Sequence, residues 1–274
     1  MRRPRSRGWL NSVIGLVLCA GLLFPLYWMI NVSLTKASDL VRQPPLLFPV
    51  NPTFSGYQLA IDKNLGALAT SLTIAVATVF VTLAVALPAA YGMSKLRAPG
   101  SGGLMFILLL AQMIPSVVLV TALFALYKQL GLLNTMFGLV LADSTASVPF
   151  AIILLQAFMR TIPDELLEAA RIDGAGRVRT FTAIVVPLSR NAVVTASLFA
   201  FLFAWGDFLN AQTLTSGNKI TPITLALFRF IGAESTNWNA VMASAVLASI
   251  PATVLLVFAQ KYVAAGVTAG AVKD

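Results

Sequence analysis

Six apolar stretches dominate this sequence, and each is long enough to cross a lipid bilayer as a helix. A transmembrane helix needs about 20 consecutive, mostly apolar residues. The composition agrees, because 58% of the residues are hydrophobic and 11% are charged, whereas a typical soluble domain carries about 25% charged residues. We therefore predict an all-α membrane protein that forms a single transmembrane domain over 1–274, with helices at about 9–32, 66–94, 103–127, 137–159, 192–214 and 239–262.

The distribution of lysine and arginine predicts how these helices are oriented. Cytoplasmic loops of membrane proteins are enriched in both residues. With the N-terminus inside, the cytoplasmic side holds 13 of the 19 basic residues. Both termini and the 160–190 segment are then cytoplasmic. The basic start before the first apolar run also resembles a signal peptide, but the run is too long and no small-x-small cleavage site follows it, so we expect a retained anchor.

Several functional classes are excluded by residues that the sequence lacks. It contains no histidine, and Cys19 is its one cysteine, which removes disulfides and most zinc, haem and iron–sulfur sites. The net charge of +9 does not indicate nucleic-acid binding, because the basic residues lie in short connections between apolar runs and form no basic stripe. There is no convincing nucleophile–base pair, so we expect no enzymatic activity and no cofactor in this chain.

The polar 160–190 segment contains a short predicted helix. Pro163 suits the first turn of a helix, and Asp164 and Glu165 follow it, where negative charge interacts favourably with the helix dipole. Gly174 suits the position just past the helix end. Asp164, Glu168 and Arg171 recur at i, i+4 and i+7 and form one polar stripe. A short amphipathic helix of this kind is a known way to enter a groove on a partner protein.

The spacing within this segment is specific. Glu168-Ala169-Ala170 is followed by three residues, Gly174, nine residues, Ile184, two residues and Pro187. Here the sequence resembles the transmembrane permease subunits of bacterial ABC importers, whose signature is Glu-Ala-Ala, three residues, Gly, nine residues and Ile-x-Leu-Pro. Val186 stands where leucine is usual, which is a conservative apolar exchange.

The resemblance continues along most of the chain, with segments typical of the carbohydrate branch of the family and a tail that resembles the maltose-type permeases. Ala89-Ala90-Tyr91 followed by Lys95 is similar to the end of the corresponding helix in that family. Trp205-Gly206-Asp207-Phe208-Leu209 and the tail from Gln260 to Lys273 are also similar, although asparagine is commoner than Gly206 after the tryptophan.

The resemblance implies a six-helix permease of a type I ABC importer in the bacterial inner membrane. Its partners would be a second homologous permease, two cytoplasmic ATPases that bind ATP and magnesium, and an extracytoplasmic solute-binding protein. The chain itself shows no Gly-x4-Gly-Lys-Ser/Thr nucleotide motif. The resemblance further implies a coupling helix held in an ATPase cleft, to which Glu168, Ala169, Ala170, Asp173 and Gly174 would contribute.

The residues that contact the transported solute are less well determined. Sugar sites combine hydrogen-bonding side chains with flat aromatic faces, so the candidates within spans are Gln112, Trp205, Asp207 and Asn210. Hydrogen bonding between helices is the alternative role for each. The alternative function is a secondary transporter driven by an ion gradient, which normally needs ionisable groups inside its spans. Asp143 and Asp207 would then be the ion-coupling candidates.

Overall fold

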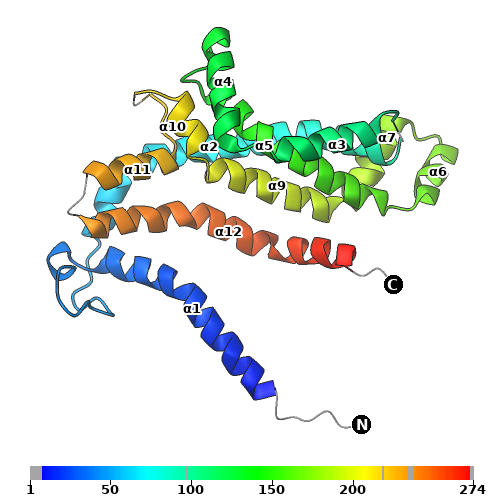
Figure 1. The fold of residues 1–274 in the computed structure, drawn as a ribbon. Helices are drawn as coiled ribbons and strands as arrows, with labels where there is room; N and C mark the ends of the chain where they lie inside the picture. Colours follow the sequence, from blue (N-terminus) through cyan, green and yellow to red (C-terminus); the bar gives the residue numbers. More distant parts are fainter. Residues whose placement is uncertain (1–7, 97, 218, 234–236, 272–274) are drawn as a thin grey trace. The chain divides into compact units, whose positions relative to one another are not determined.

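The computed structural model is entirely helical and describes residues 8–271 except 97, 218 and 234–236 (Figure 1). The chain divides into two compact units. The first unit comprises Met1–Leu65 and Leu227–Ile250, and the second comprises Gly66–Ala226 and Pro251–Asp274. Among the described residues, four helices are long and apolar enough to cross a membrane, or up to six spans result if each of two bent helix pairs counts as one span.

The first unit contains α1 (Gly8–Leu34), the short 3-10 helix η2 (Ala37–Asp39) and the adjoining ends of three further helices. Beyond α1 the chain folds back, and the side-chain amide of Asn31 donates to the carbonyl of Leu46 at 2.9 Å. A Cβ added to Gly56 would lie 2.9 Å from the carbonyl oxygen of Asn239. Asn64 donates to the buried hydroxyl of Ser244 at 3.0 Å. Glycine at position 56 therefore permits a close approach between the starts of α2 and α12.

Helix α2 (Ser55–Ser94) is longer than the predicted 66–94. The segment 33–65, which precedes the predicted span, contains four prolines, which disfavour a long regular helix. The last of these is Pro52, and the helix begins three residues beyond it. Asp62 and Lys63 are exposed, so the extra turns carry charge without burying it.

The predicted span at 103–127 is not one straight helix. It consists of α3 (Ser101–Gln112) and α4 (Ser116–Leu130), whose axes differ by 99°. Pro115 lies at the break and is the residue that precedes α4. Proline has no backbone N–H and disfavours helical geometry in the residue before it, which explains why α3 ends ahead of it.

The predicted span at 137–159 corresponds to α5 (Met136–Arg160). The hydroxyl of Thr135 caps this helix by accepting a hydrogen bond from the N–H of Gly138 at 2.9 Å. Helices α3 and α9 both pack against α5 (Figure 1). The side chains of Thr82 and Ser147 meet at 2.8 Å in the buried region between α2 and α5.

The predicted span at 192–214 is also interrupted. Helix α9 (Arg190–Trp205) ends at Gly206, and α10 (Leu209–Leu214) follows after a short break. Before α9 lie α6 (Asp164–Ile172), α7 (Arg177–Thr180), the π-helix η3 (Phe181–Val185) and α8 (Val186–Leu188). The run from α7 to α8 meets α9 at 78°. The predicted single span was therefore wrong, because the chain stops being helical at Gly206–Phe208.

The final segment contains α11 (Ile223–Ala233) and α12 (Trp238–Ala271). Helix α12 begins one residue before the predicted 239–262 and extends beyond it. Within the second unit, a cluster of buried apolar side chains joins α2, α5, α6 and α9; it includes Tyr91, Leu155, Met159, Leu167 and Val185. This cluster anchors the 160–190 segment to the long helices.

Candidate functional site

Helix α6 forms where the sequence predicts it, and its end explains the Glu-Ala-Ala-x3-Gly spacing. Gly174 has φ +78°, in the left-handed region that favours glycine. The N–H of Ala175 donates to the carbonyl of Ala170 at 2.8 Å, and the N–H of Gly174 donates to that of Arg171 at 3.0 Å. These two bonds are the Schellman arrangement that terminates helices. The spacing thus places a helix stop four residues after Ala170.

The predicted coupling residues do not all lie on one face of α6. Leu167 is 4% exposed and Ala170 is 6% exposed, so both are buried within this chain. Glu168, Ala169, Asp173 and Gly174 are exposed. Adjacent residues on a helix point about 100° apart, so Ala170 faces inward where Ala169 faces outward. The two alanines therefore lie on different faces of α6, and Ala169 is the one that a partner protein can reach.

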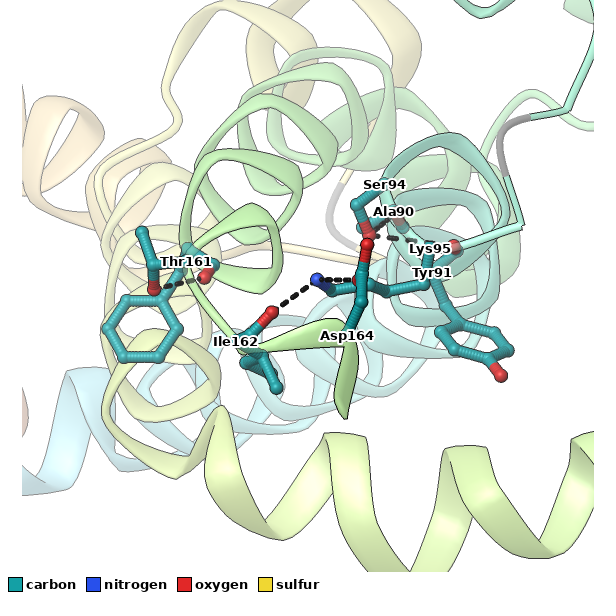
Figure 2. A network of polar contacts seen from close by, with 8 residues as sticks. Ala90, Tyr91, Ser94, Lys95, Thr161, Ile162 and Asp164 are labelled. Carbon is teal, nitrogen blue, oxygen red and sulfur yellow. Dashed lines mark hydrogen bonds and ion pairs between the residues drawn. The ribbon is translucent and has the colours of Figure 1, made fainter. Parts of the chain in front are cut away.

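The polar stripe of α6 faces a cavity of about 260 Å³. Asp164, Glu168 and Arg171 line it together with Lys95 and Leu96, which follow the end of α2. Figure 2 shows the ammonium of Lys95 pointing between the carbonyl of Ile162 and the carboxylate of Asp164, and the latter contact measures 2.7 Å. The Lys95 side chain is 4% exposed, whereas that of Asp164 is 53% exposed.

Two kinds of residue near α6 are not among the predicted coupling residues. Lys95 was recognised as part of a family-like segment, but no local pattern pairs it with Asp164, which lies 69 positions away. Leu166 and Ile172 are apolar yet 46% and 86% exposed. The helical period could have placed Ile172 opposite the face formed by Leu167 and Ala170, whereas Leu166 lies one turn before Ala170, at the edge of that face.

Two of the predicted pathway residues lie together at the start of α10. The carboxylate of Asp207 accepts hydrogen bonds from the backbone N–H of Asn210 at 3.2 Å and of Ala211 at 3.0 Å. Asp207, which precedes the N-cap residue Phe208, therefore satisfies two free N–H groups in the first turn of α10. The side-chain amide of Asn210 donates to the carboxyl group of Asp143 on α5 at 3.0 Å, and Asp143 is buried. The cluster thus includes the second acidic residue singled out from the sequence.

The other two candidates have separate partners. Gln112, at the end of α3, is exposed and donates to the carbonyl of Ala146 on α5 at 3.0 Å. Trp205 is 7% exposed and stacks on Phe201 with ring centres 5.5 Å apart. Gln112 and Asn210 therefore contact the same turn of α5, while Trp205 packs along α9.

Two further observations on the described residues bear on what they could bind. No group of three or more His, Cys, Asp or Glu side chains among these residues could hold a metal ion. A cavity of about 570 Å³ lies between α2, α9 and α12 and is lined almost wholly by apolar side chains such as Leu72, Phe80 and Phe258. None of the four pathway candidates lines it. Polar side chains instead line the pocket beside α6 and meet at Asp143 and Asn210.

Comparison with known proteins places these features in a family. Residues 83–269 match the sequence model of the family described as the binding-protein-dependent transport system inner membrane component. The diacetylchitobiose uptake system permease protein DasC of Streptomyces coelicolor is 31% identical over 270 residues, which cover 98% of each chain. The trehalose transport system permease protein SugB of Mycobacterium tuberculosis is 34% identical over 277 residues and 100% of each chain.

The fold agrees with this similarity. A chain from the crystal structure of a bacterial ABC transporter that imports the acidic polysaccharide alginate superposes with a TM-score of 0.83. The match covers 96% of this chain and 99% of that one, at 24% identity. The predicted resemblance and the predicted all-helical permease fold are both confirmed. The chain belongs to the family of binding-protein-dependent transport system inner membrane components, the multi-pass permease subunits of ABC transporters.

Proposed function

We propose that this permease forms the pathway for a sugar or sugar derivative and is driven through α6 by ATPase subunits that bind ATP and magnesium. A second homologous permease and an extracytoplasmic solute-binding protein complete the proposed importer. The names of the relatives support the carbohydrate class, because they include permeases for diacetylchitobiose, trehalose and, in Thermococcus litoralis, trehalose and maltose. The last of these is 32% identical over 268 residues, which cover 95% of each chain.

The division of α6 into buried and exposed side chains is the main support for contact with the ATPases. Leu167 packs into the core of the second unit, while Ile172 is exposed one turn after Glu168 and Leu166 is exposed on a different face of the helix. Apolar side chains that project from a polar loop are typical of surfaces that dock a partner. A firmly seated helix with a mixed apolar and charged outer face suits a protein cleft. We therefore assign ATPase contact to Glu168, Ala169, Asp173 and Gly174 and extend it to Leu166 and Ile172, with Ala170 acting from within.

The proposed orientation puts this surface on the cytoplasmic side, together with both termini. It rests on the excess of lysine and arginine in that set of loops. Arg160, Arg171, Arg177, Arg179 and Arg190 all belong to the 160–190 segment. The basic residues at 2–7, 97 and 273 also support this orientation, and they lie outside the described residues.

The four pathway candidates stay proposals. Their contacts within the chain indicate that they also hold helices together. Gln112, Asp207 and Asn210 each have a hydrogen-bond partner within the chain. The second permease is expected to supply further contacts to the solute. The same contacts weigh against an ion-gradient mechanism, because Asp207 accepts hydrogen bonds from the first turn of α10 and Asp143 accepts one from Asn210.

Reconstitution in liposomes tests this function. The permease pair with its ATPases should import solute only when ATP is on the ATPase side and the binding protein is on the other side. An imposed proton or sodium gradient should not replace ATP. Accumulation driven by a gradient without nucleotide would overturn the proposal and make Asp143 and Asp207 the first candidates for ion coupling. The solute itself can be identified as the sugar that raises the melting temperature of the cognate binding protein.

A further inference from the structure

We propose that Lys95 is a positioning residue that fixes the coupling helix α6 to the end of α2, so that movement of α6 is transmitted into that long helix. The inference rests on the proposed function, because it takes α6 as the element on which the ATPases act. It concerns a residue outside α6 and outside the 160–190 segment.

The geometry around Lys95 supports this role. Its backbone N–H bonds to the carbonyl of Tyr91 at 2.9 Å, so it continues the hydrogen bonding of α2. Its ammonium then reaches both the carbonyl of Ile162, in the connection between α5 and α6, and the carboxylate of Asp164, the first residue of α6 (Figure 2). The Lys95 side chain therefore joins the end of α2 both to the connection between α5 and α6 and to the first turn of α6.

The two contacts of the ammonium differ in expected strength. Asp164 is about half exposed, and ion pairs with an exposed partner contribute little because water and salt screen them. Ile162 is buried, and so is the Lys95 side chain. A buried ammonium that loses its acceptor loses far more than a screened pair, because the charge is left without solvation. The contact with Ile162 should therefore dominate.

The pocket between α6 and the end of α2 increases the importance of this contact. It measures about 260 Å³, is lined by Lys95, Leu167, Glu168 and Arg171, and opens to solvent at the exposed Glu168 and Arg171, so α6 is not closely packed against the end of α2 on this side. The inner face is anchored by Leu167. Without the Lys95 contact, a push on the outer face could be absorbed by α6 moving into this space. With it, the same push displaces the end of α2, a helix of 40 residues.

The principal test compares Lys95→Met with Lys95→Arg in the reconstituted complex. Solute imported per ATP hydrolysed should fall about tenfold for Lys95→Met, the loss expected when a hydrogen bond to a charged group is removed. Lys95→Arg keeps the charge and the donors and should stay near wild type. Lys63→Met is the matched control, because Lys63 is an exposed lysine at the opposite end of the same helix, and it should leave the ratio unchanged.

A second pair of variants keeps the test decisive if Lys95→Met fails to assemble. Asp164→Asn, at a half-exposed position, should lower the ratio by about twofold, in keeping with a screened ion pair. Glu165→Gln removes the neighbouring charge from the same first turn of α6 without touching Lys95 and should have no effect.

Hydrogen exchange provides an independent readout of position. In Lys95→Met, or in Asp164→Asn to a smaller degree, amides of α6 should exchange faster than in wild type, while those of α9 should not change. Wild-type coupling and wild-type exchange in both variants would overturn the role of Lys95. A wild-type complex that shows no ATP-driven import would instead overturn the proposed function, so the two failures are distinguishable.

Discussion

The side-chain amide of Asn210 donates to the carboxyl group of Asp143 at 3.0 Å and thereby ties α10 to the buried face of α5. The two residues lie 67 positions apart. Asp143 is 5% exposed, so its carboxyl group has little access to solvent. The same Asn210 donates its backbone N–H to Asp207. Asn210 thus links the buried Asp143 of α5 with Asp207, which lies in the break between α9 and α10.

Replacing Asn210 with leucine should destabilise the permease measurably. The variant leaves a buried carboxyl group without this donor, which costs about 1–3 kcal/mol. For a chain of this size, that corresponds to a fall of about 2–12 °C in the unfolding temperature. Thermal unfolding of the purified permease, followed by tryptophan fluorescence, would measure it.

Gln112→Leu is the comparison for the Asn210 variant. It also removes an amide that bonds to α5, but Gln112 is exposed and its acceptor is a backbone carbonyl that already belongs to a helix. Its unfolding temperature should stay within about 1 °C of wild type, as for most exposed substitutions. Equal losses in the two variants would show that the burial of Asp143 adds nothing to the cost of losing its donor.

Gly174→Ala should weaken the end of α6. A Cβ at this position meets no atom within 4 Å, so the cost comes solely from the left-handed backbone at φ +78° and amounts to about 1–2 kcal/mol. Hydrogen exchange at the Ala175 amide, which closes the Schellman arrangement, should accelerate. Gly176→Ala is the control, because Gly176 has φ −68° and open space around it. Identical exchange in both variants would refute this account of the spacing.

The helix content and the coupling segment were predictable because both depend on residues close together in the sequence. Apolar runs of membrane length predict the spans, and Pro163 and Gly174 mark the two ends of α6. The breaks were not predictable in the same way. Pro25, Pro88, Pro149 and Pro251 all lie inside continuous helices, whereas Pro115 lies at a 99° bend. Proline alone cannot distinguish these cases, because neighbouring helices decide whether its lost hydrogen bond is tolerated.

The polar contacts were unpredictable for a different reason. Lys95 with Asp164 and Asp143 with Asn210 are pairs separated by 69 and 67 positions. No periodicity within one helix relates such residues, and they meet only because the long helices pack in a particular register. Asp207 was predicted to line the pathway because it is a hydrogen-bonding side chain within a predicted span. Its hydrogen bonds to the start of α10 depend on a helix break that the sequence did not reveal.

The orientation of the chain can be tested with single cysteines in a Cys19→Ala background. Ser216 is exposed beyond α10, and Gly102 is exposed at the start of α3 with open space where a Cβ would stand. In intact cells, Ser216→Cys should react with a membrane-impermeant thiol reagent, because the basic residues place this region outside. Gly102→Cys should react only after lysis.

Labelling with a membrane-permeant reagent controls for accessibility in the orientation test. Both cysteines should react with that reagent in intact cells, which shows that each is exposed. Protection of Ser216→Cys and labelling of Gly102→Cys by the impermeant reagent would reverse the topology. That result would also move α6 to the side opposite the ATPases.

Glu168→Lys should uncouple the permease from its ATPases without unfolding it. Glu168 is exposed on α6, so membrane insertion and the unfolding temperature of the permease alone should be unchanged. A reversed charge in a close interface costs several kcal/mol, enough to abolish ATPase co-purification and uptake. Glu168→Gln, which removes the charge without reversing it, should retain part of both. A Glu168→Lys complex that keeps its ATPases and transports at the wild-type rate would exclude Glu168 from the contact and leave Leu166 and Ile172 as the residues to test.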